Sequence, residues 1–170
     1  MTWVFVYGSL MWDWDLDYVE RSEAVLEGYH REFNKKSVRN WGTRDSSAHV
    51  LGLEEGGECK GVAYKLPEEK RDIILSSLDE REGSSYRREE SDIRLEDGRT
   101  ATASVYINRK NHTYIGDIPM EERVKMSLEA SGRDGTGEEY VRNTYEDLQE
   151  AGIDDPYVSR YMDLMEEVEA

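Results

Sequence analysis

The sequence predicts an α+β protein in which a small mixed sheet or barrel with flanking helices is followed by a helical C-terminal part. In the first half, short apolar or alternating runs are separated by Gly and Asp turns, which is typical of β-strands. After Pro119 the apolar residues recur with helical spacing. No repeat or linker-like tract divides the 170 residues, so we expect residues 1–170 to form a single domain.

The first expected strand covers residues 3–7 (WVFVY), and residues 29–33, 49–53 and 60–66 are expected to form three more. A glycine pair at residues 56–57 lies between the last two of these runs. Because adjacent glycines are typical of tight turns, the pair predicts a hairpin.

Pro67 is expected to open the first long helix, because proline is tolerated at the first helical position. Gly83 is expected to end it, since glycine adopts the backbone conformation that commonly follows a helix. The helix is predicted to turn an apolar stripe inward that consists of Ile73, Ile74 and Leu78.

A second hairpin is expected, with residues 86–95 paired against residues 100–107. Its turn contains Asp97 and Gly98, a pair that favours type I′ geometry. Three helices are expected after it, separated by glycines and by the segment AGIDDP. Their apolar stripes are Val124 and Leu128; Tyr140, Val141, Tyr145 and Leu148; and Val158, Tyr161, Met162 and Met165. The last stripe is either core or a dimer face, so we expect a monomer or a homodimer.

The charge of the chain excludes several partners. Acidic side chains number 38 against 22 basic ones, a formal net charge of −16. Such a field repels a phosphate backbone, so we expect no nucleic-acid partner. No apolar run approaches the roughly 20 residues of a membrane span, and the N-terminus lacks the basic start of a secretory signal. We therefore expect a cytoplasmic protein without a membrane partner, whose acidity reflects either an ordinary acidic surface or a high-salt habitat.

Metal and thiol chemistry find little support in the composition. Cys59 is the single cysteine, which excludes an internal disulfide. The three histidines, His30, His49 and His112, lack the paired spacing of metal ligands. His49 also has no Ser or Cys partner discernible in the sequence, so a nucleophilic triad is unsupported.

The first candidate site is the segment Gly8, Ser9 and Leu10, into which the first strand runs directly. Glycine permits close approach, so successive backbone N–H groups can converge on an anion such as a carboxylate. The alternative is an ordinary turn at the end of a strand, in which Ser9 caps a neighbouring turn.

Glu82 is the second candidate, because it lies at the expected C-terminus of a helix, where the helix dipole disfavours a negative charge. Residues that depart from local preferences concentrate at functional sites, and a partly desolvated carboxylate is suited to general-base work. The alternative is a solvated carboxylate that pairs with Arg81 or Arg87.

Two segments resemble the signatures of the γ-glutamylcyclotransferases, in the ChaC branch that is usually described as glutathione-specific. They are WVFVYGSLMWD at residues 3–13 and LDEREGSSYRR at residues 78–88. The likeness continues between them over residues 37–69, and after them in ASGRDGTGEEY at residues 130–140. It therefore covers nearly the whole chain, with the segments in family order and at family spacing.

The resemblance implies a small closed sheet flanked by helices and an enzyme that uses no cofactor. It assigns Glu82 the role of general acid and base. It also implies that four successive backbone positions hold the γ-glutamyl group: Tyr7, Gly8, Ser9 and Leu10. Two tyrosines that match the family motifs are implied to line the site: Tyr86 and Tyr140.

The implied reaction is a lyase-type cleavage in which the α-amine of the substrate attacks its own γ-carbonyl, forming 5-oxoproline and expelling an amine. Nucleophile and electrophile are tethered in one molecule, so the enzyme supplies orientation and a base. The implied substrate is glutathione, which would release Cys-Gly and make this a glutathione-degrading enzyme, or γ-glutamylcysteine, which would release Cys.

Both substrates stay open because the late segment reads Gly135, Thr136, Gly137 where glutathione-specific members usually carry Asn. Two other functions compete with this interpretation. One is a non-catalytic binding module on the same scaffold, and the other is a cyclotransferase for other γ-glutamyl amines.

Overall fold

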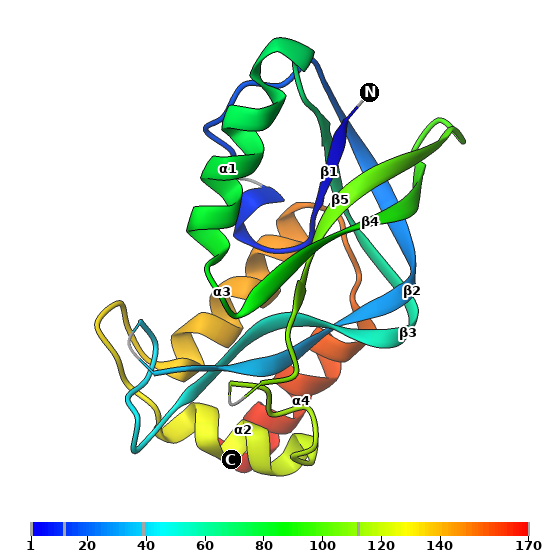
Figure 1. The fold of residues 1–170 in the computed structure, drawn as a ribbon. Helices are drawn as coiled ribbons and strands as arrows, with labels where there is room; N and C mark the ends of the chain where they lie inside the picture. The colour runs from blue at the N-terminus through cyan, green and yellow to red at the C-terminus, as the bar shows by residue number, and fades with distance from the viewer. Residues whose placement is uncertain (1, 12, 39, 112, 170) are drawn as a thin grey trace. The chain divides into compact units, whose positions relative to one another are not determined.

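Five strands form a closed barrel in the order β1-β3-β2-β4-β5 (Figure 1). They are β1 (Trp3–Val6), β2 (Glu20–Ser37), β3 (Ala48–Lys65), β4 (Tyr86–Leu95) and β5 (Thr100–Asn108). β1 is parallel to β5, whereas the pairs β1–β3, β2–β4 and β4–β5 are antiparallel. This computed structural model describes residues 2–11, 13–38, 40–111 and 113–169. The predicted α+β class with a small closed mixed sheet is confirmed.

The helices are α1 (Arg71–Glu82), α2 (Met120–Glu129), α3 (Gly137–Glu150) and α4 (Pro156–Glu169), with short 3-10 turns η1 (Ser9–Met11) and η2 (Glu68–Lys70). Within the ranges that the structure describes, no helix combines the length and the apolar character that crossing a membrane requires. The chain divides into two compact units. The first contains Met1–His30 and Glu55–Arg109, and the second contains Arg31–Glu54 and Lys110–Ala170.

The first unit is built on β1, all four of whose side chains are buried. β1 pairs closely with the last residues of β3. Gly61 makes this approach possible, because a Cβ at that position would lie 2.4 Å from the carbonyl oxygen of Val6 and 2.8 Å from Cζ of Phe5. The strand pairing therefore depends on the absence of a side chain at residue 61.

The hairpin expected at the glycine pair is wrong. β3 runs without interruption from Ala48 to Lys65, so the two expected strands are parts of one. Gly56 and Gly57 do have positive φ, at 102° and 71°, but the strand continues through them. β2 is also longer than the expected run of residues 29–33. The local glycine signal misleads here because β3 pairs with β1, which is remote in sequence.

α1 ends as the sequence predicts, but it begins at Arg71 and not at Pro67, and its buried face differs. Pro67 stands at the N-cap of η2, directly ahead of α1, and Gly83 ends α1 with a φ of 76°. Ile74 and Leu78 are buried, whereas Ile73 is 74% exposed and Leu75 is buried instead. The inward position expected for Ile73 is therefore wrong. Successive residues of an α-helix are rotated by about 100°, so Ile74, Leu75 and Leu78 share one face of the helix and Ile73 is turned away from it.

β4 and β5 form the predicted hairpin, in register from Tyr86↔Asn108 to Arg94↔Thr100. The type I′ turn is wrong, because the described residues include no non-glycine with positive φ. The Gly98 N–H donates to the Leu95 carbonyl at 3.0 Å, and Gly98 itself has a φ of 91°. This is a type I turn closed by a glycine bulge, a common form of three-residue hairpin loop.

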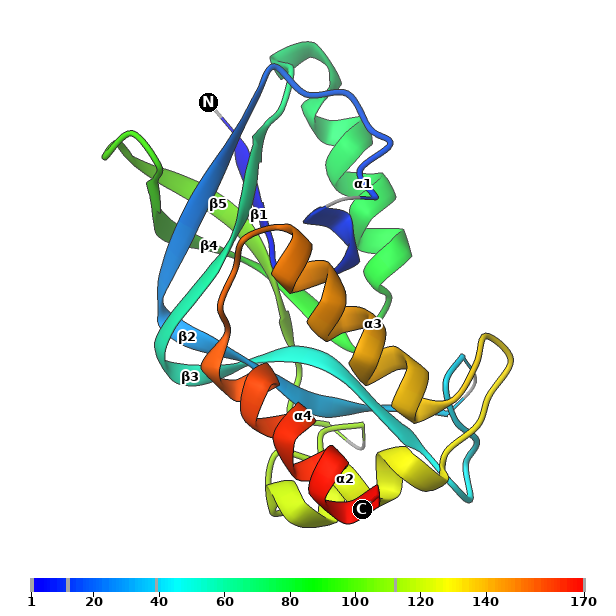
Figure 2. The ribbon, with the colours of Figure 1, turned by 180° about the vertical axis from the view of Figure 1, so that it is seen from behind.

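In the second unit, α2, α3 and α4 pack against one another (Figure 2). Each helix turns part of its expected stripe into the core, whereas Leu128, Tyr140 and Tyr145 are only half-buried. The α4 stripe lies in the core of this unit, since Tyr161 and Met165 are fully buried. The fully or largely buried stripe residues are Val124, Val141, Leu148, Val158, Tyr161, Met162 and Met165.

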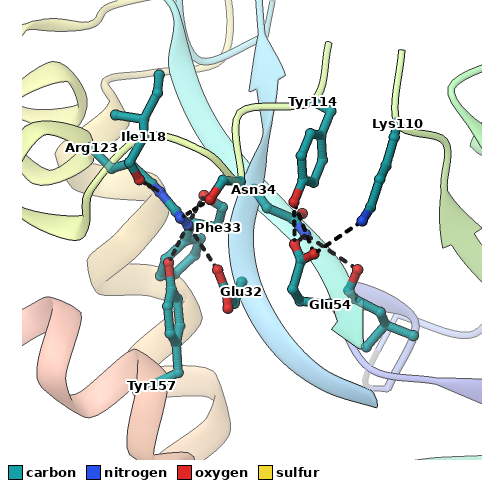
Figure 3. A network of polar contacts seen from close by, with 11 residues as sticks. Glu32, Phe33, Asn34, Glu54, Lys110, Tyr114, Ile118, Arg123 and Tyr157 are labelled. Atoms are coloured by element: carbon teal, nitrogen blue, oxygen red, sulfur yellow. Dashed lines mark hydrogen bonds and ion pairs between the residues drawn. The ribbon is translucent and has the colours of Figure 1, made fainter. Parts of the chain in front are cut away.

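The segment between β5 and α2 is anchored by a polar network within the second unit (Figure 3). The Tyr114 hydroxyl donates to Oε1 of Glu54 at 2.8 Å. Asn34 donates from Nδ2 to the other Glu54 oxygen at 2.9 Å, and Lys110 Nζ lies 3.8 Å from Oε1. A stretch that the sequence predicts only as a loop is therefore held to β2 and β3 by side chains.

Candidate active site

Glu82 is the last residue of α1, and its side chain is half-buried. Gly83 fixes this helix end, because its N–H donates to the Asp79 carbonyl at 3.0 Å while its positive φ turns the chain away. The carboxylate therefore stands at the negative end of the helix dipole, the placement that the sequence predicts. Arg87, one of the two partners that the sequence offered to Glu82, forms an ion pair with Glu89 at 2.6 Å.

The segment that follows β1 folds into the 3-10 turn η1. The Met11 N–H donates to the Gly8 carbonyl and the Asp13 N–H donates to the Ser9 carbonyl, both at 2.9 Å. The first N–H groups of any helix have no acceptor within that helix. In η1 these groups belong to the residues that precede Met11 in the turn. Leu10 and Met11 are buried and anchor the turn. In both ribbon views η1 lies beside α1 (Figures 1 and 2).

Tyr106 connects the end of β1 to the last turn of α1. The Tyr7 hydroxyl donates to the Tyr106 carbonyl at 2.7 Å, and the Tyr106 hydroxyl donates to Asp79 Oδ1 at 2.5 Å. Burial raises the pKa of Tyr106 most, followed by this hydrogen bond and the negative charge of Asp79. Arg88 lowers this pKa by a smaller amount, and the charge of Glu82 makes the smallest contribution, which raises it. Tyr106 therefore remains a protonated donor, and Glu82 lies near enough for its charge to act on it.

Tyr86 follows Glu82 closely and begins β4. Its N–H donates to the Gly83 carbonyl at 3.4 Å, and its side chain is half-buried. The structure thus brings together, in the first unit, the end of β1, the end of α1 and the start of β4. Sequence reasoning did not single out Asp79 or Tyr106, because their contact joins residues that are remote in sequence.

Tyr140 belongs to the second unit and lies in the first turn of α3. The Leu51 N–H donates to its hydroxyl oxygen at 3.1 Å, and its ring centroid lies 5.3 Å from that of Trp41. Gly135 permits this packing, because it has a φ of 149° and a Cβ there would lie 2.8 Å from Trp41 Cζ3. Thr136 caps α3 by accepting the Glu139 N–H at 3.1 Å. The late glycine segment is thus shaped by packing against an aromatic ring and by a helix cap.

His30 and His49 are the two histidines that the structure describes. His30 uses Nδ1 in a 2.8 Å contact with the Gly56 carbonyl oxygen. His49 is fully buried, and burial, with Arg123 and Lys36 adding to it, lowers its pKa to about 4. His112 lies outside the described residues. Among the residues that are described, no three His, Cys, Asp or Glu side chains gather in a way that could hold a metal ion.

The fold matches that of known enzyme structures. A crystal structure of a selenomethionine-labelled γ-glutamylcyclotransferase specific to glutathione, from yeast, matches with a TM-score of 0.86 at 21% identity, covering 98% of this chain and 96% of that one. A second crystal structure of the yeast protein gives a TM-score of 0.85. The fold is therefore that of the γ-glutamylcyclotransferases. The family model for ChaC-like proteins matches residues 2–170, and the chain belongs to the ChaC-like family.

Three relatives illustrate the range of the similarity. The glutathione-specific γ-glutamylcyclotransferase of Escherichia coli K12 is 35% identical over 156 residues, which cover 90% of this chain and 68% of the relative. γ-Glutamylcyclotransferase 2-3 of Arabidopsis thaliana is 33% identical over 169 residues, covering 92% and 84%. The human glutathione-specific γ-glutamylcyclotransferase 1 is 28% identical over 163 residues, covering 88% and 71%.

Proposed function

We propose that this protein cleaves glutathione by γ-glutamyl cyclotransfer, releasing 5-oxoproline and Cys-Gly. The chain belongs to the ChaC-like family and is accordingly an enzyme, a γ-glutamylcyclotransferase. The choice of glutathione is supported by the names of the E. coli and human relatives. γ-Glutamylcysteine remains the competing substrate, because the late segment has Gly137 in place of Asn.

In the proposed reaction the α-amine nitrogen of the substrate forms a bond to its own γ-carbonyl carbon. The bond from that carbon to the leaving nitrogen then breaks, which closes a five-membered lactam. The amine must lose a proton to attack, and the leaving nitrogen must gain one to depart. Glu82 is proposed to carry out both transfers as general base and then general acid. Such a group contributes typically 10²- to 10⁴-fold to a rate.

The segment after β1 is proposed to hold the γ-glutamyl end. The N–H groups at the start of η1 are donors suited to the α-carboxylate of the substrate, and the four positions concerned are Tyr7, Gly8, Ser9 and Leu10. Holding this end in a cyclising conformation removes much of the entropic barrier, because both reacting groups belong to one bound molecule. Tyr86 is proposed as a further wall of the site. A role for Tyr140 rests on the resemblance of residues 130–140 alone.

The reaction as written uses only proton transfers and backbone donors, so we propose that it requires neither metal nor cofactor. The enzyme is also proposed to work as a single domain over residues 1–170, because the family model spans both compact units. A cytoplasmic location is also proposed, with a monomer or homodimer as the working form. Neither nucleic acid nor membrane is proposed as a partner for this acidic chain.

The test is mass-spectrometric identification of the products formed from glutathione, from γ-glutamylcysteine and from a γ-glutamyl amine without cysteine. We expect 5-oxoproline and Cys-Gly in equimolar amounts from glutathione, or 5-oxoproline and Cys in equimolar amounts from γ-glutamylcysteine. Glutathione with an acetylated α-amine is the matched control and should not be cleaved, since its nucleophile is blocked. Release of glutamate in place of 5-oxoproline would contradict cyclisation. Thermal stabilisation by glutathione without any product would favour a binding module.

A further inference from the structure

The last turn of α1 is held by a carboxylate that the reaction itself does not require. Asp79 lies three residues before Glu82, so the two side chains project from the same face of the helix. The Asp79 carboxylate accepts the hydroxyl proton of Tyr106 on Oδ1 at 2.5 Å. Its other oxygen, Oδ2, lies 3.5 Å from a guanidinium nitrogen of Arg88. One carboxylate thus uses both oxygens to contact the sheet.

The two partners of Asp79 lie opposite each other in the β4–β5 hairpin. Arg88 in β4 and Tyr106 in β5 are directly opposite residues of the antiparallel pair, so their side chains lie on the same face. Asp79 therefore binds both strands of the hairpin at one position. The Tyr106 ring is buried at 5% exposure, which fixes the hydroxyl with little freedom.

The same residue, Tyr106, also fixes the end of β1, because its carbonyl accepts the Tyr7 hydroxyl at 2.7 Å. Asp79 in turn accepts the Gly83 N–H on its own carbonyl, which closes the helix end. A continuous set of contacts therefore runs from the strand that leads into Gly8 to the helix end that carries Glu82. Helix ends lack part of their internal hydrogen bonding and need such external contacts to be fixed.

We propose that Asp79 and Tyr106 form a positioning pair that sets the place of the Glu82 carboxylate relative to the segment after β1. This inference rests on the proposed function, because it concerns the efficiency of the same reaction. Neither residue needs to touch the substrate. Their effect arises from geometry, since a misplacement of about 1 Å at a reacting group can cost about 10²-fold in rate.

The test compares kcat and KM for 5-oxoproline release in Asp79→Ala, Asp79→Asn, Tyr106→Phe and the double variant Asp79→Ala/Tyr106→Phe. Both Asp79→Ala and Tyr106→Phe should lower kcat by roughly 10- to 100-fold, with KM changed by less than about threefold. The Asp79→Asn variant keeps an acceptor for the Tyr106 hydroxyl and should retain most of the activity. The double variant should be no slower than the slower single variant, because the pair acts as one unit.

Two matched controls separate positioning from general destabilisation. Asp72→Asn removes a charge from the exposed first turn of α1, and Tyr161→Phe removes a buried hydroxyl that is bonded to Ser127 in the second unit. Both should keep the wild-type kcat. Wild-type kcat in folded Asp79→Ala or Tyr106→Phe would overturn the proposal, as would losses that add in the double variant. Absence of 5-oxoproline from the wild-type protein would instead overturn the proposed function.

Discussion

Arg31 in β2 donates from its guanidinium to Asp155 Oδ2 at 2.6 Å, inside the second unit. The Arg31 side chain is 0% exposed and that of Asp155 is 10% exposed, so this is a buried ion pair. The other oxygen of Asp155 accepts the Val158 N–H at 3.0 Å and caps α4. The Asp155 carboxylate therefore contacts a buried guanidinium with one oxygen and caps a helix with the other.

Removing the Asp155 carboxylate should be costly. Asp155→Ala takes this carboxylate away from the buried Arg31 guanidinium and removes a helix cap, so the free energy of unfolding should fall by about 3 to 5 kcal/mol in urea titrations. Asp154→Ala, at the exposed neighbouring residue, is the control and should change it by less than about 0.5 kcal/mol. Replacing both partners by Arg31→Met and Asp155→Leu should recover part of the loss. Equal stability of Asp155→Ala and Asp154→Ala would contradict this account.

Gly61→Ala should disturb the first unit, because the new methyl group would lie 2.4 Å from the Val6 carbonyl oxygen, a backbone atom. β1 would have to move, and overpacking of this kind costs about 1 to 3 kcal/mol or more. Gly28→Ala is a suitable comparison, since that glycine has a positive φ but no atom within 4 Å of the added Cβ. Thermal unfolding should show a larger drop in Tm for Gly61→Ala. A larger drop for Gly28→Ala would show that β1 tolerates the added group.

His49 should make the protein less stable in mild acid. Neither ring nitrogen has a hydrogen-bond partner among the described residues, and burial is the main reason that its pKa falls to about 4. The unfolded chain binds a proton near pH 6.5 whereas the folded chain does not, so stability is complete above that pH and is lost as pH falls toward 4. The full loss corresponds to about 3 kcal/mol. Urea titrations at several pH values between 7 and 5 give the free energy of unfolding at each pH. This free energy should fall less steeply with falling pH in His49→Phe than in the wild type, and an equal dependence on pH would refute this role.

Arg123 should not tolerate lysine. Its guanidinium donates from Nε to the Ile118 carbonyl at 2.6 Å, and from one terminal nitrogen to Glu32 and to the Tyr157 hydroxyl, both at 2.9 Å (Figure 3). Lysine is a single point donor and cannot serve acceptors in these directions. Arg123→Lys should lower the free energy of unfolding by about 1 to 3 kcal/mol. Arg160→Lys, at an exposed position, is the control. An equal loss of unfolding free energy in Arg160→Lys would contradict the explanation from the geometry of the Arg123 hydrogen bonds.

Local patterns in the sequence predict those elements whose structure is decided locally. The β4–β5 hairpin, the end of α1 at Gly83 and the three late helices all follow from turn residues and periodicity. The continuous β3 could not be predicted in this way. Its course depends on pairing with β1, between residues such as Trp3 and Lys65. A local glycine pair carries no information about so remote a partner.

Some residues of the candidate site have a local signal in the sequence, and others do not. Glu82 stood out because its position conflicts with the helix dipole, and the segment from Gly8 to Leu10 stood out as a strand running into glycine. Asp79 is an ordinary helix aspartate in the sequence, and its importance emerges only when β5 brings Tyr106 against it. Residues that act through partners remote in sequence leave no local signature.

The central claim is that Glu82 transfers the protons of a cyclisation. The most direct test measures the rate of 5-oxoproline release by Glu82→Gln, a change that keeps the size of the side chain and removes its basicity. Glu80→Gln, an exposed neighbour on α1, is the matched control. The account predicts a loss of roughly 10²- to 10⁴-fold for Glu82→Gln at unchanged Tm, with wild-type rates for Glu80→Gln. A folded Glu82→Gln protein that releases 5-oxoproline at the wild-type rate would contradict it.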